Sequence, residues 1–299
     1  MASAHRLIIL FIDSILQANE LKIKLPSTRE QWEKVRKGFE SISRNGILVG
    51  CCGVIDGLLQ KTISPTIKET ANVRAFYSGH YEHYGLNCQG VCDSRLCFMY
   101  FRIVGPGSMN DNVAIHLAWN LIKVIEGLPF GCYMIGDAAY TLTEHLLIPF
   151  SGPSRDQAQH DTYNFYLSQL RIRIEMAFGM LVNRFRILKR PLQSKMKRNA
   201  RIILACAILH NFVLDDTYSD ESDRSGLRHT VSDCEDDNVT GTMDVDCDEE
   251  WIGDYAATGI EEDHEVVPGF SMTRNTIVEF LKNNGYRRPR HNLLRNGRL

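Results

Sequence analysis

The chain has 299 residues, 44% of them hydrophobic, which is enough for one large or two ordinary domains with a buried core. No run of residues approaches the roughly 18 consecutive apolar positions of a membrane helix, so the sequence gives no support to a membrane protein. The apolar run of residues 7–12 is broken by Asp13 and lacks a cleavage pattern, which argues against a signal peptide. Nine cysteines without framework spacing indicate free thiols in a reducing compartment.

The formal net charge of −2 hides a sharp division along the chain. Residues 215–265 carry 19 acidic residues against two arginines, a local balance of −17, so the remainder carries +15. Residues 171–201 contain ten Lys or Arg and a single acid, Glu175. Such a run often forms a solvated helix face, but the near absence of compensating acids favours a surface that binds nucleic acid.

The first predicted element is a helix that starts in residues 27–31. This segment holds two capping-box patterns, a Ser or Thr followed three positions later by Glu or Gln. Apolar residues at helical spacing carry the helix to about Ser43. A strand over residues 47–55 is predicted next, and it is apolar enough to be covered on both faces.

A hairpin is predicted from strands at residues 84–93 and 96–105. A helix should then begin after Asn110 or Asp111, either of which can cap it, and continue to residue 125. The whole region therefore alternates between strand and helix patterns.

Four further elements complete the prediction. A strand ends at Asp137, and a short helix follows over residues 143–147. Long helices are expected over residues 161–187 and 201–214, and a last helix over 273–283. The order of these elements predicts an α/β domain with a mixed sheet.

The domain prediction has four parts. Residues 1–45 form a helical lead-in, 46–214 the α/β domain, 215–265 an acidic insertion expected to be disordered, and 266–299 a C-terminal helix with a basic tail.

Three acidic residues lie in or beside apolar segments, where an unpaired carboxylate is energetically unfavourable. Asp56 and Asp137 each close an apolar run, and Glu175 interrupts a helical stretch of apolar and basic residues. Hard cations such as Mg²⁺ prefer carboxylate oxygens, and a pair of them can hold both oxygens of an in-line phosphoryl displacement. The triplet therefore predicts a site for two divalent cations.

Each acid also has a simpler interpretation. Asp56 before Gly57 can start a turn, and Asp137 can cap a helix over residues 138–146. Glu175 can form an ion pair with Arg171 one turn earlier.

Several ordered motifs add to this interpretation. They are Gly53-Val54-Ile55-Asp56-Gly57, residues 84–93, Gly105-Pro106-Gly107-Ser108-Met109-Asn110-Asp111, Gly136-Asp137-Ala138-Ala139-Tyr140, residues 168–179 and Leu209-His210-Asn211. With them, residues 25–214 and 271–296 resemble the DDE-type transposases of the PIF/Harbinger superfamily and the host proteins derived from them.

The resemblance implies an RNase H-like nuclease domain whose acidic triad falls on Asp56, Asp137 and Glu175. These residues would hold Mg²⁺ or Mn²⁺ and cleave DNA phosphodiesters. Asp111 also matches a family position and is a candidate accessory residue, although helix capping explains it equally well.

Four arginines of the basic segment are candidate DNA contacts: Arg171, Arg173, Arg184 and Arg186. The other interpretation of these residues is a solvated helix face.

The sequence also departs from the family pattern. Only about 45 residues precede the first catalytic strand, so a full helix-turn-helix region for binding transposon ends is not expected. Many relatives have Thr-His after the Asp-Gly pair, where this chain has Leu58-Leu59. The alternative function is therefore a domesticated, catalytically silent DNA-binding or protein-interaction module. The resemblance further implies nuclear residence, a separate Myb-like DNA-binding partner and a possible homo-oligomer.

Overall fold

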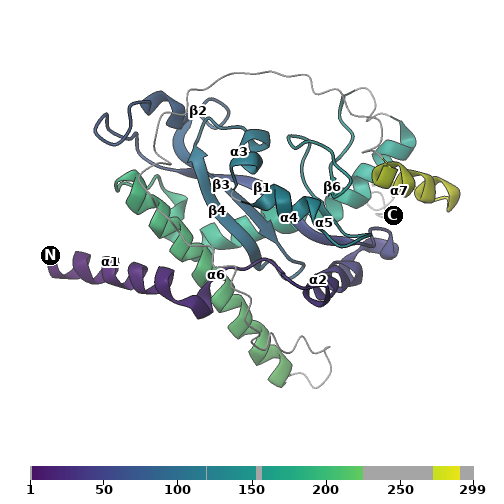
Figure 1. Ribbon diagram of the computed structural model, residues 1–299, viewed down its shortest axis with the longest axis horizontal. Coiled ribbons are helices and arrows are strands. Elements are labelled where there is room, and N and C mark those ends of the chain that lie inside the picture. Colours follow the sequence, from purple (N-terminus) through teal and green to yellow (C-terminus); the bar gives the residue numbers. More distant parts are fainter. Residues whose placement is uncertain (1, 119, 153–156, 225–271, 290–299) are drawn as a thin grey trace, which may run out of the picture.

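A computed structural model describes residues 2–118, 120–152, 157–224 and 272–289. A mixed six-stranded sheet lies at its centre, with helices packed around it (Figure 1). The strands are β1 (Cys51–Lys61), β2 (Tyr77–Ser78), β3 (His83–Cys92), β4 (Phe98–Pro106), β5 (Tyr133–Ile135) and β6 (Leu146–Leu147). The α-helices are α1 (Ala2–Gln17), α2 (Arg29–Ile42), α3 (Asp111–Leu117), α4 (Leu121–Glu126), α5 (Ala158–Arg184), α6 (Met196–Arg224) and α7 (Met272–Asn283).

Strand β1 is the central strand of the sheet. It pairs antiparallel with β3 on one side and parallel with β5 on the other. Beyond them, β3 pairs antiparallel with β4, and β5 pairs parallel with β6. Three antiparallel strands followed by two parallel ones, with helices on the faces, confirm the predicted RNase H-like α/β fold.

The two faces of the sheet bury separate apolar clusters. Val54 of β1 packs in one cluster with Leu170 and Ile174 of α5 and with residues of α6. Its neighbour Ile55 belongs to the other cluster, with Ile115 of α3 and residues of α4. Successive strand residues point to opposite faces, so a continuous apolar run is what a strand covered on both sides requires.

The sequence predicted several elements correctly. Helix α2 begins with a capping box in which Gln31 N–H donates to Thr28 Oγ1 at 3.2 Å, and the Gln31 side chain accepts from the Thr28 N–H. The predicted hairpin is β3 and β4, and the predicted last helix is α7. The predicted long helices are α5 and α6, although both begin several residues earlier than predicted.

The prediction for the first strand was wrong at both ends. β1 starts at Cys51 and continues through Asp56 and Gly57 to Lys61. Asp56 pairs with Gly90 and Gly57 with Gln89 in the ladder with β3. The Asp-Gly pair therefore lies inside a strand and does not form a turn, because the long β3 supplies hydrogen-bond partners beyond it.

Two predicted helices also differ from the structure. The helix expected from residue 110 to 125 is divided into α3 and α4, and Asn120, at the start of α4, has a left-handed backbone with φ 58°. The helix expected over residues 143–147 is absent, and its last two residues form β6 beside β5. An apolar pair of residues at a sheet edge gains ladder hydrogen bonds that an isolated short helix would lack.

The middle of α6 is tied to the β3–β4 turn and the start of β4 by the Leu209-His210-Asn211 motif. The Asn211 side chain accepts a hydrogen bond from Phe98 N–H at 2.8 Å and donates one to the Phe98 carbonyl at 2.7 Å. The His210 ring, fully buried, contacts the Leu96 carbonyl through Nε2 at 3.0 Å. Burial lowers the pKa of His210 to about 4, so the ring is neutral at physiological pH.

The acidic segment expected over residues 215–265 is described only in part. Residues 215–224 continue α6, whereas residues 225–265 lie outside the described residues, as does the basic tail from Arg290 onward. None of the helices in the described ranges combines the length and apolar character needed to cross a membrane.

Candidate active site

Asp56 and Asp137 come from neighbouring parallel strands. Asp56 lies within β1, and Asp137 follows β5 after Gly136. Both carboxylates are half-buried. The negative charge of Asp137 acts on Asp56, so the two side chains share one site.

The Asp56 carboxyl group is strongly perturbed. Its pKa is raised to about 7, first by burial and then by the charges of Asp137 and Asp111, against the opposing effects of the Gly57 N–H and Arg171. The Gly57 N–H donates to Asp56 Oδ1 at 2.8 Å. A carboxyl group with this pKa binds a proton readily near neutral pH, or a cation in its place.

Asp137 is held by a local turn. Its Oδ1 accepts a hydrogen bond from Ala139 N–H at 2.8 Å. The helix that Asp137 was expected to cap is absent, so helix capping does not explain this residue.

Asp111 is the third carboxylate of the site. It is the first residue of α3, and Asn110, the preceding residue, caps the helix by accepting from Val113 N–H at 2.8 Å. The capping interpretation of Asp111 is therefore wrong. Its carboxylate lies directly over Gly57, where a Cβ atom would stand 2.1 Å from Oδ1.

Burial also raises the pKa of Asp111, and the charge of Asp137 adds to this effect. Hydrogen bonds from the side-chain amides of Gln89 and Asn87 oppose it. Three half-buried carboxylates thus repel one another in one place, which is the arrangement that a bound cation relieves.

Gln89, which was not predicted from the sequence, organises this site. Gln89 is completely buried on β3, and its Nε2 donates to Asp111 Oδ1 at 2.8 Å and to Asn87 Oδ1 at 3.0 Å. Its Oε1 accepts from the Tyr140 hydroxyl at 2.7 Å. The signal was present in the sequence: Asn87 and Gln89 alternate in an otherwise apolar strand and so point to the same face.

Tyr81 is a second residue that the sequence analysis missed. It lies in the loop between β2 and β3, and its side chain is exposed. Burial of its hydroxyl end raises its pKa, and the charges of Asp111, Asp56 and Asp137 add to the shift. An aromatic ring therefore lies at the solvent side of the carboxylates.

Glu175 differs from its predicted environment. It was expected beside apolar groups, but its side chain on α5 is 46% exposed and forms an ion pair with Arg171 Nη1 at 2.6 Å. Arg171 in turn acts on Asp56 and lowers its pKa. The ion pair that the sequence allowed as an alternative is thus present, and Arg171 acts on both Glu175 and Asp56. Over the described ranges, no three His, Cys, Asp or Glu side chains form a ready-made set of metal ligands.

The four candidate DNA-contacting arginines lie in different environments. Arg171 pairs with Glu175, and Arg184 donates to the His210 carbonyl at 3.2 Å, so Arg184 stabilises the interior. Arg173 is half-buried and its Nε has no hydrogen-bond partner. Arg186 is exposed in the turn after α5 and has the most accessible position for a phosphate.

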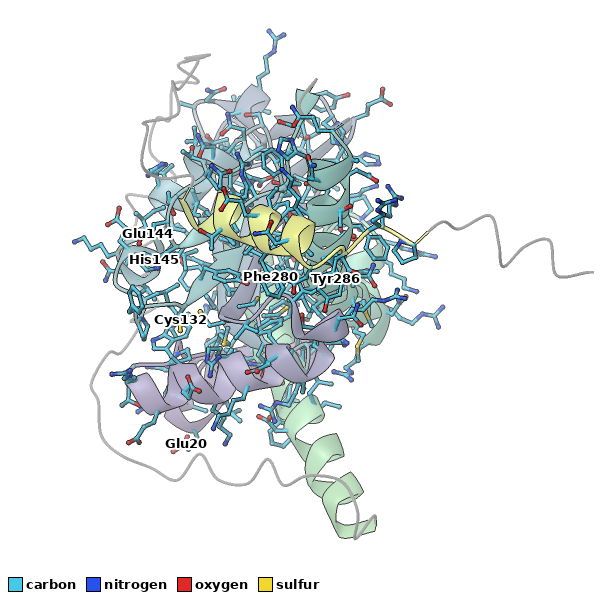
Figure 2. The ribbon with its side chains drawn as sticks, turned by 90° about the vertical axis from the view of Figure 1, so that its right-hand side faces the viewer. Glu20, Cys132, Glu144, His145, Phe280 and Tyr286 are labelled. Atoms are coloured by element: carbon cyan, nitrogen blue, oxygen red, sulfur yellow. The ribbon has the colours of Figure 1, made fainter. Side chains whose placement is uncertain are left out.

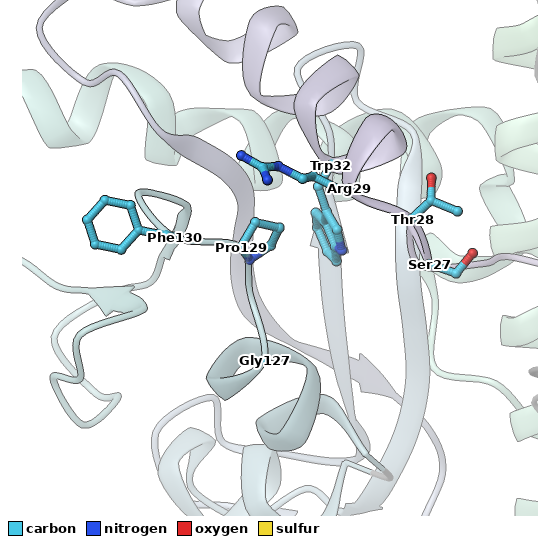
Figure 3. A pocket seen from close by; sticks show the side chains of 7 residues that line it. All are labelled: Ser27, Thr28, Arg29, Trp32, Gly127, Pro129 and Phe130. Atoms are coloured by element: carbon cyan, nitrogen blue, oxygen red, sulfur yellow. The ribbon is translucent and has the colours of Figure 1, made fainter.

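A surface pocket lies elsewhere, between α2 and the loop that precedes β5 (Figure 3). Its volume is about 370 Å³, and its lining residues are Ser27, Thr28, Arg29, Trp32, Gly127, Pro129 and Phe130. It lies beside the start of β5, whereas Asp137 follows the end of that strand. The pocket is therefore separate from the carboxylates.

Comparison with known proteins assigns these residues to one family. Residues 55–211, more than half of the chain, match the family described as DDE superfamily endonuclease. The chain is 25% identical over 217 residues to the protein named "Putative nuclease HARBI1" of Bos taurus, covering 72% of this chain and 59% of that protein. Its mouse counterpart is 33% identical over 135 residues, which cover 44% of this chain and 38% of that protein.

A plant relative gives a similar result. The Arabidopsis thaliana protein named "Protein ALP1-like" is 25% identical over 219 residues, which cover 69% of this chain and 52% of that protein. The chain thus spans between half and three fifths of the length of these cattle and plant relatives. No solved structure shows a significant match.

Proposed function

Because this chain belongs to the DDE superfamily endonuclease family, we propose that it cleaves DNA phosphodiesters with the help of two divalent cations, Mg²⁺ or Mn²⁺. The observation that carries the proposal is the mutual electrostatic influence of three half-buried carboxylates, Asp56 in β1, Asp137 after β5 and Asp111 at the start of α3. Their oxygens are the donors that hard cations prefer, and their mutual repulsion favours a bound positive charge. The donor set therefore fits the metals expected for the family.

In this proposal Asp56 and Asp137 hold the cations, and Asp111 adds a third carboxylate. Bound cations would activate water or a DNA 3′-hydroxyl and stabilise the leaving oxygen. Glu175 would join the site by leaving Arg171, since both side chains are long and partly exposed. The Arg171 guanidinium, freed from this ion pair and close to Asp56, would then bind a DNA phosphate.

One observation favours a second candidate function. The carboxylate of Glu175, the predicted third member of the triad, forms a close ion pair with Arg171 within α5 and so is not free to bind a cation. A chain in which this pair persists would bind DNA through its basic surface without cutting it. Such a chain would be the domesticated, catalytically silent DNA-binding module that the sequence offers as the alternative function.

Nicking of supercoiled DNA by the purified chain in Mn²⁺ or Mg²⁺ tests the proposal. The variants are Asp56→Asn, Asp137→Asn and Glu175→Gln, each of which removes a charge and keeps the shape. The matched control for Glu175→Gln is Asp161→Asn, because Asp161 also lies on α5 in an exposed ion pair, with Arg288 at 2.7 Å. We expect the three variants to lose at least about 100-fold in rate, as removal of a group that stabilises the transition state does, and the control to retain activity.

The two functions give different results. DNA binding with no metal-dependent nicking by the wild-type chain would support the silent module. Nicking that survives Asp56→Asn and Asp137→Asn would overturn the assignment of the site.

Three further expectations remain proposals. The family relationship supports a nuclear location, a separate Myb-like protein that directs the chain to its target, and assembly into a homo-oligomer. Tagged-protein imaging, partner capture with quantitative mass spectrometry and light scattering of the purified chain test them in turn.

A further inference from the structure

Helix α1 carries apolar side chains on two opposite faces. Its inner face packs against Ala205 and Ile208 of α6 through Ile12, Ile15 and Leu16. Its outer side has four large apolar side chains, each more than half exposed: Leu7, Ile8, Leu10 and Phe11. A helix that is apolar on both sides is normally covered on both sides.

Helix α1 is attached to the rest of the protein along one side only. It projects from the body where it crosses α6 (Figure 1). Asp13 forms an ion pair with Arg201 of α6, and His5 Nε2 lies 3.2 Å from Arg198 Nη1. Glu20, in the turn after α1, lies at the edge of the body from which the end of α6 projects (Figure 2). The described residues therefore leave the outer face of α1 uncovered.

The outer face forms a continuous stripe along the helix. Leu7, Leu10, Phe11 and Ser14 have the spacing i, i+3, i+4 and i+7, which places them on one side of a helix. The exposed Ser14 donates its hydroxyl hydrogen to the Leu10 carbonyl at 2.9 Å. The stripe can therefore be buried without leaving that hydroxyl group unpaired.

The area of this patch is what one side of a dimer interface needs. Four large apolar side chains, each more than half exposed, make a patch of about 400 Å². A standard interface covers about 800 Å² of each partner, and a little more than half of that area is apolar. The outer side of α1 thus supplies the apolar part of such an interface.

The stripe is complementary to a second copy of itself that runs antiparallel. A two-fold axis between positions 10 and 11 sets Leu10 against Phe11 of the second copy, and Leu7 against Ser14. The small Ser14 leaves room for Leu7, and the larger pair fills the centre. Each contact is made twice, because the same surface is used by both copies.

Charged side chains favour the same orientation. Arg6 and Asp13 are seven residues apart, close to two helical turns, so they lie on the same flank of the stripe. Antiparallel pairing brings the first half of one helix against the last half of the other, and so brings Arg6 beside Asp13 of the second copy. The last turn of α1 has no basic residue of its own. A cation from the second copy therefore also complements the helix dipole there.

We propose that α1 is a dimerisation helix, through which two copies of this chain pair antiparallel about a two-fold axis. With the α6 helix of each copy, the two α1 helices form a four-helix arrangement. The homo-oligomer proposed above rests on the family relationship, whereas this surface and its symmetry come from α1 itself. The pairing uses none of the residues of the proposed nuclease site.

The first experiment measures the mass of the purified full chain by light scattering at several concentrations. We expect the wild type to have twice the mass of one chain. Phe11→Glu should raise the dissociation constant of the dimer at least about tenfold, since it places a charge at the centre of the interface. Phe130→Glu is the matched control, because Phe130 is also exposed but lies in the loop before β5, and it should leave the mass unchanged.

Two outcomes of this experiment would overturn the proposal. One is a monomeric wild-type chain, including a monomer whose α1 binds another protein or a lipid vesicle. The other is a dimer that Phe11→Glu leaves intact, because such a dimer uses a different surface. Circular dichroism of each variant checks that its helices remain folded.

The second experiment tests the antiparallel pairing by disulfide cross-linking. It uses chains with Cys234→Ser and Cys247→Ser, so that the cysteines that remain are buried. One sample carries Leu7→Cys and another carries Ser14→Cys. Oxidation of the mixture should link position 7 of one chain to position 14 of the other, and either sample alone should link much less. Equal cross-linking of Leu7→Cys alone would overturn the antiparallel pairing.

Both readouts are independent of nuclease activity. A chain that dimerises through α1 but does not nick DNA would refute the proposed function and support the dimerisation helix. A chain that nicks DNA as a monomer would do the reverse.

Discussion

The side-chain amide of Gln89 donates a hydrogen bond to the carboxylate of Asp111 at 2.8 Å, from a position that is completely buried. A neutral residue of β3 thus fixes the orientation of an acid at the start of α3. The same amide accepts from Tyr140, three residues after Asp137. Gln89 therefore connects the strands and loops that supply the three aspartates.

Replacement of Gln89 by Leu should weaken cation binding without removing any carboxylate. Asp111 loses its principal donor, and the buried Tyr140 hydroxyl loses its acceptor, which costs about 1–3 kcal/mol of stability. Titration with Mn²⁺ by calorimetry, together with thermal melts, measures the two effects. Tyr140→Phe is the control, since it removes the hydroxyl and leaves the Asp111 hydrogen bond intact. If Gln89→Leu binds Mn²⁺ as tightly as Tyr140→Phe, the orienting role is wrong.

Ionisation of the Asp56 carboxyl group should lower the free energy of unfolding of the metal-free protein as the pH rises. Its folded pKa is raised to about 7 from an ordinary value of 3.8, so the folded state favours the protonated form. The stabilisation is complete below about pH 4 and is lost as the pH rises through about 7. Asp56→Asn should therefore be more stable than the wild type at pH 8, by on the order of 2 kcal/mol. Denaturant unfolding in EDTA at pH 4 and pH 8 measures the difference, which should be largely gone at pH 4.

Asn211 should stabilise the fold because its side chain forms two hydrogen bonds with the backbone of Phe98. Asn211→Ala leaves both the N–H and the carbonyl of Phe98 without their partner, with an expected loss of about 2–4 kcal/mol in the free energy of unfolding. Urea unfolding measures this loss. Phe212→Ala, the neighbouring exposed position on α6, is the matched control and should cost much less. Similar losses of stability in the two variants would contradict a stabilising role for the two Asn211–Phe98 hydrogen bonds.

Arg186 should contribute to DNA binding, whereas Arg29 should not. Arg186 is exposed after α5, and Arg29 lies beside the pocket at the start of β5. Arg186→Gln should weaken binding to any DNA sequence and reduce the slope of log affinity against log salt by about 1. Fluorescence anisotropy at several salt concentrations gives the slope. An unchanged slope with Arg186→Gln, or an equal change with Arg29→Gln, would remove Arg186 from the DNA surface.

The sequence predicted the fold well where local signals agree with tertiary structure. The capping box at Thr28, the β3–β4 hairpin and the long helix α5 all appear as expected, although α5 begins a few residues early. It failed at Asp56-Gly57, where a turn signal lies inside a strand, because the pairing with Gln89 and Gly90 of β3 decides the outcome. It also failed at Leu146-Leu147, whose strand depends on β5 being present. Long-range pairing of this kind leaves little trace in a local pattern.

The candidate site, like the fold, could be predicted only in part from local sequence patterns. Asp56 and Asp137 could be proposed from the sequence because each closes an apolar run and matches a family motif. The role of Asp111 could not be decided from the sequence. An aspartate near the start of a helix is expected both for a helix cap and for a residue of the site. The ion pair of Glu175 with Arg171 was foreseen as an alternative, but its exposure depends on how α5 packs on the sheet. The alternation of Asn87 and Gln89 marks a polar position in an apolar strand, but its partners, Asp111 and Tyr140, are brought to it only by the fold.

The close approach of Asp111 to Gly57 bears on how relatives of this chain are compared. Any side chain at position 57 would occupy the space that the Asp111 carboxylate now fills. A relative could therefore keep all three aspartates and still lose their arrangement through one change from glycine. A comparison that counts only acidic residues would score such a relative as intact, so position 57 should be examined first.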